Sequence, residues 1–169
     1  MNNRSKTQMM ILMALLIALS YIGGMIKILG SVALDAMPAY FAALVLGGPM
    51  GAAVGAIGHL FSALLAGFPL SIPMHALITI SMAAACWFYG YLYQKTNIFL
   101  ASAVAIFING PIMTYGSAIL AKALGIVPSV MAFFTPMILP LIIASTVNVV
   151  LAAIVYLALS KTLFKNNLE

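Results

Sequence analysis

Long apolar runs, separated by short polar or glycine- and proline-rich breaks, are the main pattern along this chain. The first run covers residues 8–26, a length that spans a bilayer with ordinary tilt. The polar turn at residues 94–97 (Gln-Lys-Thr-Asn) is the clearest internal break. Because each crossing needs about 20 apolar residues, a chain of 169 residues holds at most about six or seven helices. The pattern predicts a single all-α domain over residues 1–169.

Glycine and proline divide the remaining runs. The segment 30–38 holds Asp35 and is predicted to be a loop or a re-entrant segment, while residues 47–49 (Gly-Gly-Pro) break the chain between two helices. Asn109-Gly110-Pro111 lies in the middle of another helix, where the missing amide donor of proline predicts a kink. Residues 131–136 are expected to be an irregular entry to the last helix. The six predicted helices cover residues 8–26, 38–46, 50–66, about 73–93, 98–120 and 136–163.

Composition excludes a soluble globule. Hydrophobic residues make up 65% of the chain and charged residues only 5%, whereas soluble domains carry roughly a quarter charged residues. A soluble chain of this length buries only about 70% of its surface and needs polar groups to cover the rest. The mean hydropathy of +1.20 therefore indicates an integral membrane protein.

The distribution of charge predicts orientation. The cations are scattered and do not form the basic face of a nucleic-acid-binding protein. Six crossings place both termini on one side, and the side with more cations is the cytoplasmic one. With this arrangement the cations on the side of the termini are Arg4, Lys6, Lys95, Lys161 and Lys165, against Lys27 and Lys122 on the other side. The termini are therefore predicted to be cytoplasmic.

Polar residues within the predicted bundle lie in its central and outer parts. Such groups are costly in lipid and usually face a cavity or the bundle interior, so together they predict a ligand pocket that opens outward and ends near the midplane. The candidate site residues are Asp35, His59, His75, Asn109, Tyr115 and Asn148.

Packing is an alternative explanation for several of these residues. His59 can donate to a carbonyl of a neighbouring helix, and His75 can act at a helix start. The amide of Asn109 can satisfy a carbonyl freed by the kink. Asn148, with Ser145 three residues earlier, forms a small polar face that suits either packing or a ligand.

Small residues predict close helix packing. Gly51 and Gly55 have the small-xxx-small spacing that lets helix backbones approach in lipid. Ala14 and Ala18 have the same spacing, and on this pattern alone they would also be packing residues.

The segments 34–49 (LDAMPAYFAALVLGGP) and 51–59 (GAAVGAIGH) resemble the S components of energy-coupling-factor (ECF) vitamin transporters, and the likeness covers nearly the whole chain. The resemblance implies a six-helix subunit in the cell membrane of a prokaryote, which captures a vitamin or precursor from outside. Its partners would be a transmembrane T subunit and two ABC ATPase subunits, and Ala14 and Ala18 would contact the T subunit. ATP would serve only the partner ATPases, because this chain has no G-x-x-x-x-G-K-[ST] phosphate loop.

Within this family, segment 58–69 (GHLFSALLAGFP) most resembles the S components assigned to alpha-ribazole, a nucleoside precursor of cobalamin. Riboflavin or a hydroxymethylpyrimidine would use the same polar groups. The nickel and cobalt members begin with Met-His, and Met1-Asn2 departs from that pattern. The resemblance therefore implies an organic cargo and no resident cofactor or metal in this chain.

Two other classes share part of this pattern. An intramembrane metal enzyme would need Asp35, His59 and His75 to converge from three separate elements, and no H-E-x-x-H pair is present. A structural or pore-forming protein would share the composition without the outward position of the polar residues. We therefore expect a carrier subunit without catalytic activity.

Overall fold

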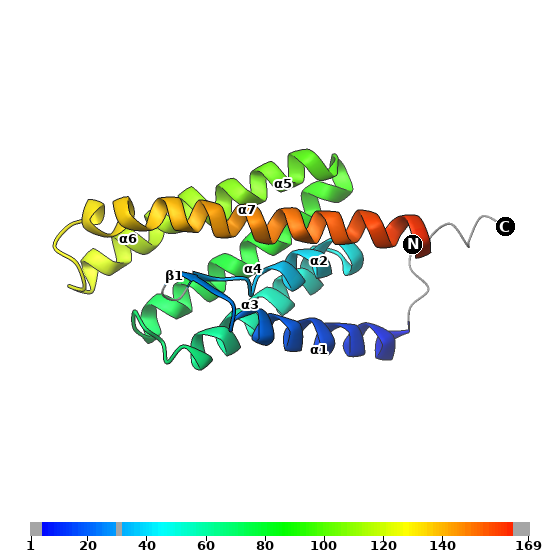
Figure 1. Cartoon of the computed structure of the whole chain (residues 1–169), viewed down its shortest axis with the longest axis horizontal. Coiled ribbons are helices and arrows are strands. Elements are labelled where there is room, and N and C mark those ends of the chain that lie inside the picture. The colour runs from blue at the N-terminus through cyan, green and yellow to red at the C-terminus, as the bar shows by residue number, and fades with distance from the viewer. Residues whose placement is uncertain (1–4, 30–31, 164–169) are drawn as a thin grey trace.

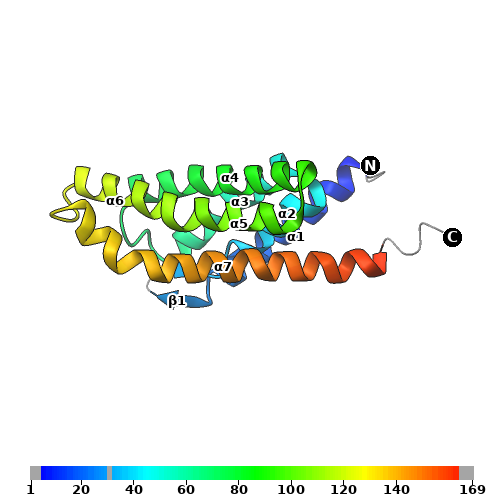
Figure 2. The ribbon, with the colours of Figure 1, turned by 90° about the horizontal axis from the view of Figure 1, so that it is seen from above.

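The structure, a computed structural model, describes residues 5–29 and 32–163. In this part of the chain, helices lie side by side along one long axis and form an elongated bundle (Figures 1 and 2). The elements in chain order are α1 (Lys6–Gly23), β1 (Lys27–Leu29), β2 (Val32–Ala33), α2 (Met37–Leu46), α3 (Gly48–Leu65), α4 (Ile72–Lys95), α5 (Ile98–Phe107), the π-helical turn η1 (Ile108–Ile112), α6 (Met113–Ala123) and α7 (Val130–Leu163).

The described residues contain five helical segments that are long and apolar enough to cross a membrane. These are α1, α3, α4, the continuous α5–η1–α6 unit and α7. The remaining predicted helix, at residues 38–46, corresponds to α2. It has only 10 residues, so it is about 15 Å long, whereas the hydrocarbon core of a bilayer is about 30 Å thick. The structure confirms an all-helical bundle of five long apolar helices and one shorter helix, while six membrane crossings stay a prediction.

α2 lies in the interior of the bundle, between α1, α3, α4 and α7. Small side chains allow this position: Ala39, Ala42 and Ala43 are completely or almost completely buried. Tyr40 is also fully buried, and its ring meets the ring of Tyr89 on α4 edge to face at 5.4 Å. α2 therefore acts as a core element on which the longer helices pack.

A short β-ribbon connects α1 to α2, where the sequence predicted a longer first helix and then a loop. β1 pairs antiparallel with β2, with Lys27 opposite Ala33. α1 ends at Gly23, which lies against the backbone of Leu34, a contact that leaves no room for a side chain. The predicted helix to residue 26 was therefore three residues too long. Part of the predicted loop, residues 30 and 31, lies outside the described residues.

The predicted break between the second and third helices is confirmed. Gly47 has a φ of +94°, a conformation that glycine adopts without steric cost. α3 begins directly after it, with Pro49 in the first turn, where a missing N–H has no helical partner to lose. α3 therefore starts at Gly48, two residues before the predicted position.

Gly51 and Gly55 bring the backbone of α3 close to two other helices. A Cβ added at Gly51 would overlap Ala43 of α2, and one added at Gly55 would lie 3.0 Å from the Cys86 sulfur of α4. The predicted packing role of Gly51 and Gly55 is confirmed.

The kink predicted at Pro111 is the π-helical turn η1, and the helix continues through it. A π turn contains an extra residue, so the following residues of α6 are rotated relative to α5. The hydroxyl of Thr114 donates to the carbonyl of Gly110 at 2.6 Å. Gly110 itself lies against Ile142, because a Cβ there would be 3.1 Å from that side chain. The turn thus fits closely against α7.

α7 begins six residues before the predicted start at Pro136. The hydroxyl of Ser129 accepts a hydrogen bond from the N–H of Ala132 at 3.2 Å, which caps the first turn. The helix then continues through Pro136 and Pro140. Proline is tolerated inside helices packed in a membrane bundle, and these two residues are one turn apart, so their missing donors lie on one side. The predicted irregular entry at residues 131–136 is therefore wrong.

α1 begins and α7 ends at the same end of the bundle (Figures 1 and 2). The connections after α3 and after α6 lie at the opposite end. This arrangement agrees with termini on one side of a membrane. The cytoplasmic location of that side stays a prediction.

Candidate functional site

A cavity lies among α3, α4, η1, α6 and α7 and is closed on one side by the segment between β2 and α2. The space between its walls is about 780 Å³, a volume that includes solvent at its open mouth. Lining residues come from the first turns of α4 and α7 and from α6, so the cavity lies toward the end of the bundle away from the termini. Its lining residues are Ala33, Asp35, Ala36, His59, Leu70, His75, Ile78, Met82, Asn109, Met113, Thr114, Ser117, Phe133, Met137, Leu141, Ala144, Ser145 and Asn148.

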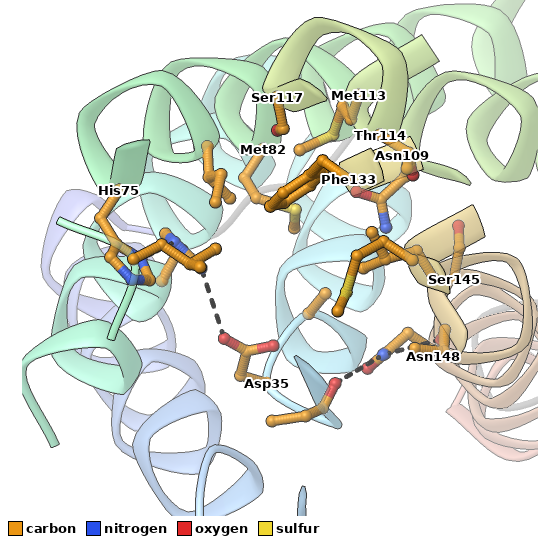
Figure 3. A pocket seen from close by; sticks show the side chains of 18 residues that line it. Asp35, His75, Met82, Asn109, Met113, Thr114, Ser117, Phe133, Ser145 and Asn148 are labelled. Carbon is orange, nitrogen blue, oxygen red and sulfur yellow. Dashed lines mark hydrogen bonds and ion pairs between the residues drawn. The ribbon is translucent and has the colours of Figure 1, made fainter. Parts of the chain in front are cut away.

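Asp35, His59 and His75 form a chain of contacts along one wall. The Nδ1 atom of His59 lies 3.5 Å from a carboxylate oxygen of Asp35. Its Nε2 atom lies 3.3 Å from Nδ1 of His75, and the two imidazole rings are stacked with centroids 5.4 Å apart. Figure 3 shows Asp35 and His75 on this side of the cavity. Three residues from separate elements are therefore brought together, as the predicted pocket requires.

The geometry of this chain restricts its protonation. The contact between His59 and His75 needs one ring nitrogen to donate and the other to accept. If neutral His59 donates to Asp35 through Nδ1, its Nε2 accepts from the Nδ1–H of His75. If His59 is an imidazolium, it donates to both neighbours and His75 accepts. The two rings therefore cannot both be imidazolium while the contact persists.

His75 is held tightly by its surroundings. It is only 2% exposed, and the ring of Phe68 meets it edge to face at 5.5 Å. The backbone carbonyl of His75 accepts a hydrogen bond from the hydroxyl of Thr79 at 2.7 Å. Its Nε2 atom is buried and has no hydrogen-bond partner among the described residues. One strong polar atom at this wall is thus unpaired.

Asn148 lines the cavity, but its amide bonds to the backbone. Its oxygen accepts from the N–H of Met37 at 2.7 Å, and its nitrogen donates to the carbonyls of Ala33 at 3.3 Å and Ala144 at 2.9 Å. These bonds attach the end of β2 and the start of α2 to α7. Of the two roles considered for Asn148, the structure shows the packing role.

A second group of polar side chains comes from η1, α6 and α7. The amide of Asn109 makes no hydrogen bond to the described residues, so it does not satisfy a carbonyl at the kink, as the alternative predicted. The hydroxyl of Thr114 bonds to the carbonyl of Gly110 instead. Ser145 is 1% exposed, and its hydroxyl has no partner among the described residues. Asn109 and Ser145 therefore offer unused hydrogen-bonding groups at the cavity.

Tyr115 is not among the residues that line the cavity, so this cavity does not support its predicted place in the site. Its side chain is 48% exposed, and its ring packs edge to face on Phe134 at 5.7 Å. Thr114 and Ser117 line the cavity instead. The spacing of Gly110, Thr114, Ser117 and Ala121 at helical intervals was the sequence signal for this face, and all four residues are buried.

The remaining wall is apolar and adaptable. Met82, Met113 and Met137 have flexible, polarisable side chains that fit irregular ligand shapes, and Phe133 offers a flat apolar surface. The sequence does not distinguish these residues from others, because methionine and phenylalanine occur throughout the chain. One wall with hydrogen-bonding groups and another with sulfur and aromatic groups suit a ligand with a planar apolar ring and polar substituents.

The three residues of the alternative metal site meet in the structure. Their side chains form a line, because His59 directs one ring nitrogen to Asp35 and the other to His75. Among the described residues, no group of three or more His, Cys, Asp or Glu side chains is arranged to hold a metal ion.

The two alanines predicted to contact a partner subunit lie on the outer surface of α1. Ala14 and Ala18 are exposed, whereas Leu16 and Ser20 on the same helix are buried against the bundle. Their face is therefore free for contact in the isolated chain. The contact itself stays a prediction.

Comparison with known proteins identifies the family. The model of the family described as "ECF transporter, substrate-specific component" matches residues 8–160, and this range includes every residue that lines the cavity. No curated protein and no solved structure matches the chain. The chain therefore belongs to the family of substrate-specific components of ECF transporters, a family of transport subunits and not of enzymes.

Proposed function

We propose that this protein captures alpha-ribazole, or a closely related vitamin precursor, from outside the cell for an ECF-type importer. The observation that carries the proposal is the cavity, in which Asp35, His59 and His75 face an apolar wall of methionines and Phe133. The family supplies the coarser function of a substrate-specific membrane subunit. A T subunit and two ABC ATPases would supply energy and deliver the ligand inward.

The excess of cations near the termini supports an outward-facing cavity. The positive-inside rule places the start of α1 and the end of α7 in the cytoplasm of a prokaryotic cell. The cavity lies toward the other end of the bundle. A ligand from outside would therefore reach it without crossing the whole membrane.

The chemistry of a benzimidazole nucleoside suits the two walls. Ribose hydroxyls can donate to the carboxylate of Asp35, and further hydroxyls can pair with Asn109 and Ser145. The neutral aromatic ring can lie against Phe133 and the methionines. The resemblance of segment 58–69 to the alpha-ribazole members supports this ligand over riboflavin or a hydroxymethylpyrimidine.

A ligand screen on the purified chain tests the proposal, because a ligand that binds only the folded state raises the unfolding temperature. The screen contains alpha-ribazole, riboflavin, thiamine, a hydroxymethylpyrimidine, cobalamin and divalent metal ions. We expect alpha-ribazole to stabilise the protein, and Asp35→Ala or His75→Ala to remove the effect. Stabilisation by a flavin alone would keep the carrier function and discard alpha-ribazole. Stabilisation by a metal ion alone would overturn the proposal.

Uptake by cells tests the division of labour between the subunits. Accumulation of the ligand should require this chain together with the T subunit and both ATPases. Accumulation by this chain alone would contradict the proposed dependence on the partners.

A further inference from the structure

The charges around the cavity are unevenly distributed. Asp35 is the acidic residue among the lining residues, and no lysine or arginine lines the cavity in the described part of the chain. Lys6 and Lys95 belong to the end of the bundle near the termini, and Lys122 is exposed in the last turn of α6. Among the side chains that the structure describes at the cavity, a bound anion would therefore meet a carboxylate and no fixed cation.

The two histidines do not give the polar wall of the cavity a net positive charge. Because one ring must accept in the contact between His59 and His75, at most one of them is an imidazolium. With Asp35 ionised, the three side chains together are therefore either neutral or negative. No distribution of protons that keeps both contacts and the carboxylate ionised makes this wall positive.

At three helix starts near the cavity, a backbone N–H that could bind an anion is already bonded within the protein. Helix N-termini attract phosphate through their free N–H groups. At the start of α2, the N–H of Met37 donates to Asn148. At the start of α4, the N–H of Met74 donates to the hydroxyl of Ser71, and at the start of α7 the N–H of Ala132 donates to Ser129. The helix ends near the cavity are therefore capped by the protein itself.

From these observations we infer that the cavity selects against anionic ligands, so that a nucleoside-like cargo enters without a phosphate group. The inference rests on the proposed function, because it defines the chemical class of the captured ligand. A phosphate monoester carries nearly two negative charges at neutral pH. In a partly buried site it would lose hydration, gain no cationic partner and be repelled by Asp35. Neutral or cationic ligands with hydroxyl or amine donors avoid these costs.

The experiment compares ligands that differ only in one phosphate. Calorimetric titration of the purified full chain uses alpha-ribazole with its 5′-phosphate, riboflavin with flavin mononucleotide, and thiamine with thiamine monophosphate. In a pair that contains a ligand of this protein, we expect the unphosphorylated member to bind at least about 30-fold more tightly, the effect of one like charge several ångströms away at intermediate dielectric. A phosphorylated member that binds as tightly as its partner overturns the inference.

Variants identify the source of the selectivity. Asp35→Asn keeps the shape of the side chain and removes its charge, so the difference between the members of a pair should shrink. Ser117→Ala changes a neutral group of the same cavity and should leave the ratio unchanged. Asp35→Ser serves as a second variant if Asp35→Asn fails to fold. If the affinity ratio between the unphosphorylated and phosphorylated ligands is undiminished in the folded variant, the inference is wrong.

The inference and the proposed function can fail separately. If thiamine binds, alpha-ribazole does not and thiamine monophosphate is rejected, the proposed ligand is wrong and the charge selectivity stands. If alpha-ribazole and its phosphate bind equally well, the proposed ligand stands and the charge selectivity is wrong.

Discussion

Gly58 on α3 lies directly against Ser20 on α1. A Cβ added at Gly58 would be 2.7 Å from the Cβ of Ser20 and 2.8 Å from its hydroxyl oxygen. Ser20 is fully buried, so neither of these atoms belongs to a side chain that can swing away into lipid. The contact places the backbones of α1 and α3 close together.

We expect Gly58→Ala to separate α1 from α3 and to lower the free energy of unfolding by about 1–3 kcal/mol, the usual cost of overpacking. Thermal unfolding in detergent measures this loss. Ser20→Gly in the same chain should restore much of it, because it removes both close atoms. Gly116→Ala is the matched control: Gly116 is also helical, and a Cβ there has no atom within 4 Å. An equal loss in both alanine variants would contradict the packing explanation.

Asn148→Leu should destabilise the empty protein by about 1–3 kcal/mol, because it removes three side-chain hydrogen bonds and leaves the N–H of Met37 without its partner. The unfolding temperature without ligand is the measurement. Asn148→Asp keeps the acceptor for Met37, but an ionised carboxylate would face the carbonyl oxygens of Ala33 and Ala144 in a buried site, so its loss should be at least as large. Normal stability of Asn148→Leu would contradict the structural role of this amide.

Ser145→Ala should weaken ligand binding by about 3- to 10-fold, the value of one hydrogen bond, without destabilising the empty protein. The reason is that the buried hydroxyl has no partner among the described residues, so its removal breaks no bond there. Calorimetric titration and unfolding temperature are measured together. A marked fall in the stability of the empty protein would show that the hydroxyl serves the fold instead.

Tyr115→Leu should leave ligand affinity unchanged within about twofold, because this side chain lies outside the cavity. Ser117→Val, two residues along the same helix, should reduce affinity, because it replaces a polar group of the cavity by an apolar one. The pair tests the rotation of α6 by the π turn. Lost affinity in Tyr115→Leu alone would show that the described face of α6 is wrong.

Ala14→Trp or Ala18→Trp should prevent assembly with the T subunit and leave ligand binding intact. Both alanines are exposed on α1, so the larger side chain is tolerated by the isolated subunit and blocks a close partner. Co-purification with the T subunit measures assembly. Ala84→Trp on α4, also at an exposed position, is the control and should still assemble. Lost ligand binding together with lost folding would count against the prediction.

The lengths and breaks of apolar runs were sufficient to predict most helices. Their exact ends depended on packing that a single sequence does not display. α1 stops at Gly23 because the chain crosses closely at Leu34, and α7 continues through Pro136 because its neighbours support it. Proline was interpreted as a helix start there, although in a membrane bundle it is also tolerated within a helix.

Part of the candidate site could be predicted from the expected depth of polar residues in the membrane. Asp35 and His75 were expected in the outer part of the bundle and His59 nearer its middle, and the structure brings the three into contact. The sequence did not predict that Ser117, and not Tyr115, lines the cavity. A kinked α-helix and a π turn have similar sequences, but they direct different residues inward.

The amide of Asn148 binds the chain two residues before and two residues after Asp35, at Ala33 and Met37. The carboxylate is therefore carried on a short bridge whose two ends are fixed to α7. The place of Asp35 beside His59 therefore depends on a side chain of a helix that is more than 100 residues away in the sequence.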